Sequence, residues 1–151
     1  MKIKTLLIAL LCGLMMSCGS DEDDINAAGG NFTAKIDGTE WSGSSNTVIT
    51  SILNNFLVAI GAGRADQSSM ALTLNISSKS TGTYTTADNG AFGGTYIDSD
   101  GNVFMSSTGS ITITKFEETS ISGTFNFTAS TLAGQTITVT DGEFTDVNIQ
   151  N

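Results

Sequence analysis

The chain has no histidine and no proline, and it has only two cysteines. Without histidine it lacks the commonest general base and the commonest metal ligand, and every Ser-His-Asp arrangement is excluded. Without proline, turns and exposed strand edges depend on Gly, Asn, Asp and charged residues. Carboxylates are therefore the main groups left for any catalytic chemistry.

Basic residues are also scarce: the chain has six Lys and Arg against fifteen Asp and Glu, with a formal net charge of −9. Phosphate binding needs a basic face, so we expect no nucleic-acid partner. An anionic membrane surface would also repel such a chain. Any attachment to a membrane should therefore depend on a covalent lipid.

The first 17 residues have the order of an export signal. Lys2 and Lys4 precede an apolar run from Leu6 to Met16, followed by Ser17 and Cys18. Two lysines before an apolar segment are typical of a signal held on the cytoplasmic side during export. The run has eleven residues, and a membrane-spanning helix needs about 20. We therefore predict a removable signal peptide over residues 1–17.

Two cysteines compete for the processing site. Cys12 lies inside the apolar run, where cleavage would truncate the signal, whereas Cys18 follows the small residue Ser17. The segment before Cys18 resembles the lipobox of lipoproteins cleaved by signal peptidase II, with Met15 where Leu is usual. The resemblance implies a diacylglycerol thioether on Cys18, an acylated amino group and stable anchoring. An ordinary secretory signal followed by a free cysteine is the alternative.

Residues 18–30 are expected to form an acidic tether. Asp21 to Asp24 is a run of like charges that should repel and extend, and Ala27 to Gly30 is flexible in composition. A cysteine followed closely by Ser and several acidic residues resembles the surface-export signal of Bacteroidota lipoproteins. That resemblance implies attachment to the outer membrane, with display on the cell surface. After processing, Cys18 is the sole cysteine, so neither an intramolecular disulfide nor a thiolate metal site is expected.

From Asn31 onward the sequence alternates between apolar and polar residues and predicts a single β-domain over residues 31–151. No later segment shows helical spacing over three turns. The clearest strand is Ser120 to Ala129, in which Gly123 occupies the apolar phase and indicates a bulge or a close backbone approach. Other short strands are expected at 39–42, 48–53, 83–85, 92–97 and 103–105, and around Ile111 and Ile113.

Turn residues divide these strands. Asp37-Gly38 predicts a two-residue hairpin, and Asn54-Asn55 predicts another. A tight turn is expected at Glu117-Glu118, and a further turn at Asp141-Gly142. Phe144 is out of phase with the residues after it, which predicts a bulge near Thr145-Asp146. Many short strands joined in this way predict an antiparallel β-sandwich or β-barrel, and alternation does not separate the two.

Three segments carry a family resemblance. They are Phe32-Thr33-Ala34-Lys35-Ile36-Asp37-Gly38, Ile121-Ser122-Gly123-Thr124-Phe125-Asn126-Phe127-Thr128 and Thr138-Val139-Thr140-Asp141-Gly142-Glu143-Phe144. They resemble small Bacteroidota lipoproteins grouped as a domain family of unknown function. The resemblance covers most of residues 31–149. It implies a location in the envelope and brings no known catalytic residues.

Candidate site residues each have a plainer interpretation. Trp41, Tyr84 and Tyr96 are candidate ligand-binding aromatics, with core or rim positions as the alternative. Asp98, Asp100 and Asn102 place oxygen groups at alternate positions, as hard cations prefer, but the segment lacks the rest of an EF-hand loop. A hairpin turn is the preferred interpretation of that segment.

Two acidic pairs, Glu117-Glu118 and Asp141/Glu143, are candidates for the two carboxylates of a glycosidase. Solvated turn positions are the preferred interpretation. Taken together, the sequence predicts a lipid-anchored, non-catalytic β-domain at the outer membrane that binds a glycan or an envelope protein, with no cofactor besides the lipid on Cys18. A purely structural envelope lipoprotein and, more remotely, a carboxylate-based hydrolase are the alternatives.

Overall fold

The structure is a computed structural model that describes the backbone of residues 31–52 and 55–150 and the side chains of residues 31–45 and 56–150. Within these ranges every regular element is a β-strand, as the alternation predicts. The predicted leader and tether, with Cys18, lie outside the described residues, as does Asn54 of the predicted second hairpin turn. The strands are β1 (Asn31–Ile36), β2 (Thr39–Ile52), β3 (Asn55–Gly63), β4 (Ser69–Ile76), β5 (Gly82–Thr85), β6 (Phe92–Ile97), β7 (Val103–Phe116), β8 (Ser120–Ser130) and β9 (Thr136–Gln150).

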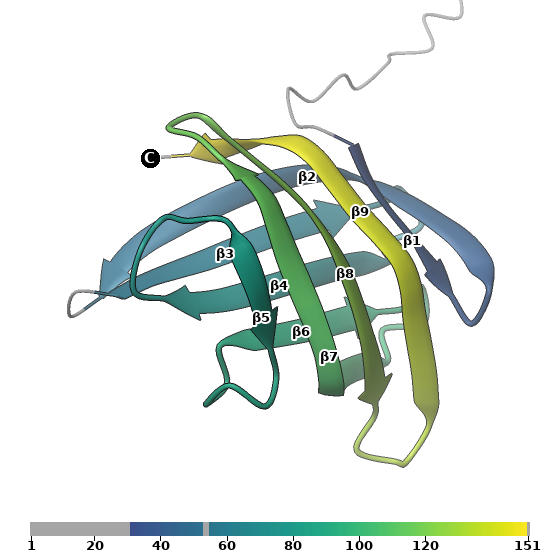
Figure 1. The fold of residues 1–151 in the computed structure, drawn as a ribbon. Coiled ribbons are helices and arrows are strands. Elements are labelled where there is room, and N and C mark those ends of the chain that lie inside the picture. Colours follow the sequence, from purple (N-terminus) through teal and green to yellow (C-terminus); the bar gives the residue numbers. More distant parts are fainter. Residues whose placement is uncertain (1–30, 53–54, 151) are drawn as a thin grey trace, which may run out of the picture.

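Eight of the strands close into an antiparallel barrel (Figure 1). β1, β2, β3, β4, β6, β7, β8 and β9 are neighbours in that order, and β9 pairs back with β1, for example through Phe144 and Phe32. The order follows the sequence, so each connection in this circuit joins adjacent strands, with β5 inserted between β4 and β6. Closure removes the exposed edges that an open sheet would leave. The pairing thus decides for a barrel over a sandwich.

The extra strand, β5, lies outside this circuit and shares one side of β7 with β6. β6 pairs with Val103–Met105 at the start of β7, and β5 pairs with Ser110–Ile113 further along. The short strands expected at 103–105 and around Ile111 are therefore two parts of a single strand, and the prediction of separate strands was wrong. The same holds for 39–42 and for 48–52 of the expected strand 48–53, which both belong to β2. Local composition does not reveal that one strand continues past a change of partner.

The interior of the barrel is filled with apolar side chains. Phe32, Phe125, Phe127 and Phe144 form its centre, with neighbouring ring centroids 5.1–6.3 Å apart. Barrels of eight strands have an interior just wide enough for side chains or for one small ligand. Trp41 of β2, Phe92 of β6 and aliphatic residues from other strands of the circuit complete the core, including Val58, Ile60, Leu72, Leu74, Ile111, Ile113, Ile121, Val139 and Val147.

Glycines within the strands make room for these rings. A side chain at Gly123 would collide with the carbonyl oxygen of Thr112 and lie 2.7 Å from Cζ of Phe144. Gly94 has the same relationship to the Phe127 ring, at 2.8 Å. The close backbone approach predicted at Gly123 is therefore confirmed, and the register between β8 and β9 also shifts beside it.

The predicted turn at Asp141-Gly142 was wrong, because both residues lie inside β9. Asp141 has a φ of 49°, and the pairing of β9 with β1 and with β8 shifts register at this point. This is a β-bulge, in which one extra residue bends the strand. The bulge predicted near Thr145-Asp146 is confirmed by a second shift, where the backbone N–H of Asp146 donates to Oγ of the buried Ser122 at 2.8 Å.

The two ends of the barrel differ. We call one the hairpin end; it is formed by residues 37–38, 64–68, 98–102 and 131–135. The Asp37-Gly38 hairpin is confirmed there, and Asp37 holds it against β9 by accepting a 2.8 Å hydrogen bond from the backbone N–H of Thr138. We call the other the C-terminal end; it is formed by residues 77–81, the turn at 117–119 and the end of β9 (Figure 1).

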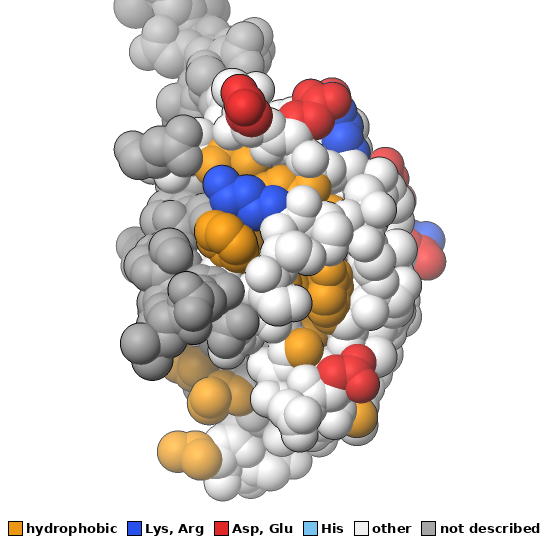
Figure 2. Space-filling view, turned by 60° about the vertical axis from the view of Figure 1, so that its left-hand side comes forward, with side chains coloured by type: hydrophobic (Ala, Val, Ile, Leu, Met, Phe, Trp, Pro, Cys, Tyr) orange, Lys and Arg blue, Asp and Glu red, His pale blue; other side chains and the backbone are white. Residues whose placement is uncertain are grey.

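The outer surface is mainly neutral and polar, as the alternation predicts. Charged side chains are few and scattered on the face shown in Figure 2. On β7 and β8 the outward residues are mostly Thr, Ser and Asn, and some are linked across strands, as between Ser110 and Asn126 at 3.2 Å. The part of the chain that the structure describes holds no helix long or apolar enough to cross a membrane.

Candidate functional site

Trp41, the only tryptophan, is fixed at the hairpin end by a chain of hydrogen bonds. Its Nε1 donates to Oγ of Ser68 at 3.0 Å, and that hydroxyl donates to Oδ1 of Asp66 at 2.6 Å. The backbone N–H of Ser68 donates to the same carboxylate oxygen at 3.0 Å. These hydrogen bonds from Ser68 hold the pKa of Asp66 below its ordinary value. Asp66 also lies 3.5 Å from Nε of Arg64, so one short loop positions a carboxylate, a guanidinium and the indole together.

Of the three candidate aromatics, the structure brings two together. The rings of Trp41 and Tyr96 meet edge to face, with centroids 6.3 Å apart. Burial, reinforced by the nearby carboxylates of Asp98 and Asp66, raises the pKa of Tyr96. Tyr84 lies on β5, away from this pair, and its hydroxyl donates to the carbonyl of Ser80 at 3.4 Å. Trp41 is only 5% exposed, so its ring face is not available for stacking on a sugar.

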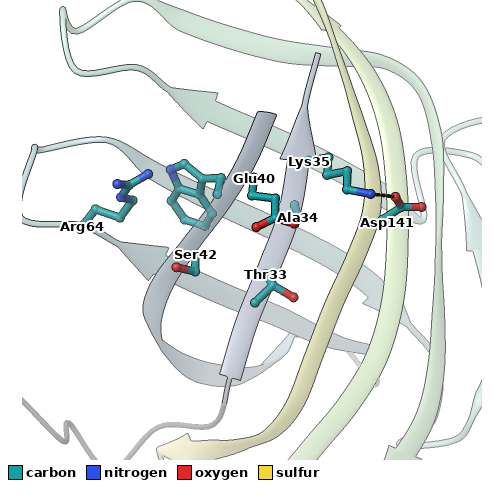
Figure 3. A pocket seen from close by; sticks show the side chains of 8 residues that line it. Thr33, Ala34, Lys35, Glu40, Ser42, Arg64 and Asp141 are labelled. Carbon is teal, nitrogen blue, oxygen red and sulfur yellow. Dashed lines mark hydrogen bonds and ion pairs between the residues drawn. The ribbon is translucent and has the colours of Figure 1, made fainter. Parts of the chain in front are cut away.

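A trough of about 600 Å³ runs over the outside of β1 and β2 beside Trp41 (Figure 3). The register of the first hairpin builds it, because Thr33 pairs with Ser42 and Lys35 pairs with Glu40. All four of these side chains point away from the core. The trough extends from Arg64 at one side to Asp141 of β9 at the other, and Ala34 and Trp41 complete its lining.

The charges in the trough alternate in sign, and among the described residues some of them have an ion-pair partner whereas one has none. Nζ of Lys35 lies 2.9 Å from Oδ2 of Asp141, and this hydrogen bond is the main reason that the pKa of Lys35 is raised. The Asp141 bulge places the carboxylate within reach of the lysine. Glu40 also raises that pKa by its proximity, but among the described residues its carboxylate forms no hydrogen bond and no ion pair within 4 Å. Glu40 is therefore the charged group of the trough that is least engaged by a partner, while Arg64 keeps guanidinium donors beyond its contact with Asp66.

The Asp98–Asn102 segment is the β6–β7 hairpin, and its oxygens serve the turn itself. Oδ1 of Asp98 accepts from the backbone N–H groups of Asp100 and Asn102, and Oδ2 accepts from the side-chain amide of Asn102 at 2.8 Å. The hydrogen bonds from Asn102 lower the pKa of Asp98. Within the described residues, no group of three or more His, Cys, Asp or Glu side chains is placed to hold a metal ion.

The two acidic pairs lie in different parts of the barrel. Glu117 and Glu118 form the predicted turn at the C-terminal end, where Glu117 pairs with Lys115 at 3.2 Å. Asp141 pairs with Lys35, and Glu143 accepts a hydrogen bond from the hydroxyl of Thr145. Asp141 and Glu143 also line a smaller depression of about 380 Å³ over β8 and β9.

Sequence reasoning missed Glu40, Lys35, Arg64 and Ser68. The first two were within reach, because a two-residue turn at Asp37-Gly38 fixes Lys35 opposite Glu40 on the outer face. Arg64 and Ser68 carry no local signal. They reach the site only because β3 and β4 follow β2 around the barrel and bring their connecting loop to the indole.

These features define a small closed β-barrel domain with a packed interior, a neutral polar exterior and a trough of mixed charge beside a buried tryptophan. The chain belongs to the family described as Domain of unknown function (DUF6252), which matches residues 29–148. A search of curated proteins and a search of solved structures found no match. Membership of a domain family of unknown function, as predicted from the sequence, is thereby confirmed.

Proposed function

We propose that this chain is a non-catalytic binding module of the cell envelope that is anchored to the outer membrane through a lipid on Cys18 and faces outward. The order of basic residues, apolar run, Ser17 and Cys18 supports the anchor, and the acidic run after Cys18 supports surface display. The trough beside Trp41 carries the binding role. In the trough, Glu40 and Arg64 have hydrogen-bonding capacity that a ligand could use, and they lie beside an indole that Ser68 holds in place.

The chemistry of the trough fits a ligand rich in hydroxyl groups, such as a glycan. Thr33 and Ser42 both donate and accept hydrogen bonds, Glu40 accepts them and Arg64 donates them. A sugar hydroxyl also donates and accepts, so one ring satisfies groups of both kinds. The indole supports the wall from beneath through its bond to Ser68 rather than stacking on the ligand. An envelope protein with a polar surface is the second kind of ligand that this lining suits.

The carboxylate chemistry supports a non-catalytic role. A glycosidase needs one carboxylic acid with a raised pKa to protonate the leaving group. Asp66 and Asp98 have lowered pKa values because hydrogen bonds stabilise their charged forms. Asp141 is held in an ion pair with Lys35.

A structural role without a small ligand is the second candidate. The outer face of β7 and β8 favours it, because Thr, Ser and Asn cover that face in rows, with cross-strand contacts such as Asn126 to Ser110 at 3.2 Å. Such a surface is well hydrated and offers few distinctive groups to a ligand. A structural role predicts that substitutions in the trough have no effect on any binding.

The anchor is tested by growing cells with a fatty-acid probe and comparing Cys18→Ala with Cys12→Ala. Labelling should disappear in the first variant and persist in the second, because Cys12 belongs to the removed signal. Labelling that persists in Cys18→Ala would show that the processing site is elsewhere.

The trough is tested by binding the purified protein to an array of bacterial surface glycans. We expect Glu40→Gln to reduce binding at least tenfold and the matched variant Glu118→Gln, at the opposite end of the barrel, to leave it unchanged. Absence of binding to any glycan, or equal binding by the two variants, would overturn the assignment of the trough. A pull-down from native membranes that recovers a stoichiometric envelope protein would instead favour an accessory subunit.

A further inference from the structure

The apolar interior of the barrel reaches solvent at the C-terminal end. Along β3, Val58 is fully buried and Phe56 is partly exposed, and along β9, Val147 is fully buried and Ile149 is partly exposed. Phe116 at the end of β7 is partly exposed in the same way. All three residues continue the inward face of their strands. Together with Tyr84 of β5, they form what we call the apolar mouth: Phe56, Tyr84, Phe116 and Ile149.

The strand ladder around the barrel is interrupted beside this mouth. Toward the C-terminal end, β6 no longer pairs with β7, and the four-residue β5 takes its place. β5 pairs with β7 alone, so its other edge makes no ladder with β4 in the described part of the sheet. Figure 2 shows hydrophobic side chains visible in a hollow on this side of the molecule, with a basic side chain across them.

Lys79 is the basic residue at the mouth, and it differs from the other cations that the structure describes. Lys35, Arg64 and Lys115 each have a carboxylate within 4 Å. Lys79 has none among the described residues, and its Nζ lies over the ring of Phe56, 5.5 Å from the centroid. A cation over an exposed ring is weakly held. An anion that approaches the mouth would find this ammonium group without a competing carboxylate.

We propose that the apolar mouth binds a long-chain fatty acid, whose hydrocarbon chain covers Phe56, Tyr84, Phe116 and Ile149 and whose carboxylate pairs with Lys79. Burial of methylene groups against these side chains favours the complex, and the ammonium group of Lys79, which has no carboxylate within 4 Å among the described residues, fixes the orientation. The interior beyond the mouth is packed, so the chain lies in the mouth and does not fill the barrel.

Charge favours a monomeric amphiphile over larger partners. The chain has a net charge of −9, so a second copy or an anionic bilayer brings many like charges against it, whereas a fatty acid brings one carboxylate, which Lys79 pairs with. The proposal is independent of the trough, because the mouth lies at the opposite end of the barrel from the loop that carries Arg64.

The test uses the full chain with Cys18→Ala, which carries no acyl group of its own, and measures the binding of hexadecanoic acid and of 1-hexadecanol by displacement of a fluorescent fatty acid. We expect micromolar binding of the acid. Lys79→Met, which keeps an apolar stem, should weaken the acid at least tenfold and leave the alcohol unchanged. The matched variant Lys35→Met, in the trough, should change neither.

Three outcomes would overturn the proposal: no binding of hexadecanoic acid, an equal effect of Lys79→Met on acid and alcohol, or self-association through the mouth that Phe116→Ser abolishes in light scattering. Because Lys79 is exposed, its variant is expected to fold. Glycan binding through Glu40 is unaffected by each of these outcomes, so failure here is distinguishable from failure of the proposed trough function.

Discussion

The indole N–H of Trp41 donates a hydrogen bond to the hydroxyl of Ser68 at 3.0 Å, and both side chains are buried. This bond joins β2 to the loop between β3 and β4, two segments that are 27 residues apart in sequence. The same loop carries Arg64 at one side of the trough. The shape of the trough therefore depends on a polar contact inside the barrel.

Ser68→Ala is expected to lower the free energy of unfolding by about 1–3 kcal/mol, because it leaves the buried indole N–H without an acceptor. Chemical denaturation followed by tryptophan fluorescence measures this change. Ser99→Ala, at an exposed loop position, is the matched control and should change stability by no more than about 0.5 kcal/mol. Equal effects of the two substitutions would mean that the Trp41–Ser68 bond does not stabilise the fold.

The hydrogen bonds to Asp66 predict how the tryptophan environment responds to acid. The pKa of Asp66 is lowered in the folded state, so its stabilising effect is complete above the ordinary aspartate value of about 3.9 and is lost as the pH falls through the lower folded value. The emission maximum of Trp41 should stay constant from neutral pH to about pH 4 and shift to the red only below it.

Asp66→Asn should remove the part of this acid response that belongs to the loop, and Asp100→Asn, in the exposed hairpin, should leave it in place. A red shift in the wild-type protein centred well above pH 4 would contradict the assignment, since it would require an aspartate with a raised pKa. The measurement is a steady-state fluorescence titration, which a single tryptophan makes simple to interpret.

Gly123→Ala should destabilise the barrel by about 1–3 kcal/mol, the usual cost of inserting an atom into a packed core. The new methyl group would lie 2.7 Å from Cζ of Phe144 and collide with the backbone of Thr112. Gly63→Ala is the matched control, because nothing lies within 4 Å of a side chain there. Thermal denaturation should give a lower Tm for the first variant and an unchanged or slightly higher Tm for the second. Similar Tm values for the two variants would mean that the Phe144 ring moves to accommodate the added methyl group without loss of stability.

The sequence predicts the local parts of this fold well, because alternation and turn residues act over a few positions. Phe32, Ala34 and the Asp37-Gly38 turn determine the first hairpin without reference to the rest of the chain. The bulge of β9 near Asp146 can also be predicted from the sequence, because Phe144 is out of phase with the apolar residues after it. Asp141-Gly142 misled the prediction, because the same dipeptide that closes a hairpin also suits a bulge inside a strand.

What the sequence does not predict are the contacts made by closure. The bond from Thr138 to Asp37 joins residues 101 positions apart, and the pair Lys35–Asp141 depends on the same meeting of β1 and β9. Alternation requires only that one face is buried, and both a sandwich and a barrel meet that requirement. The trough lies at this closure, so Arg64 and Asp141 reach it from segments that have no local relation to the Lys35–Glu40 hairpin pair.

Amide NMR of the protein titrated with short oligosaccharides from hydrolysed envelope polysaccharide shows most directly whether the trough over β1 and β2 is the ligand-binding surface. We predict saturable shifts confined to Thr33–Lys35, Glu40–Ser42 and Arg64. Shifts that spread instead over the hydroxyl-rich face of β7 and β8, or no saturable shifts at all, would contradict that assignment.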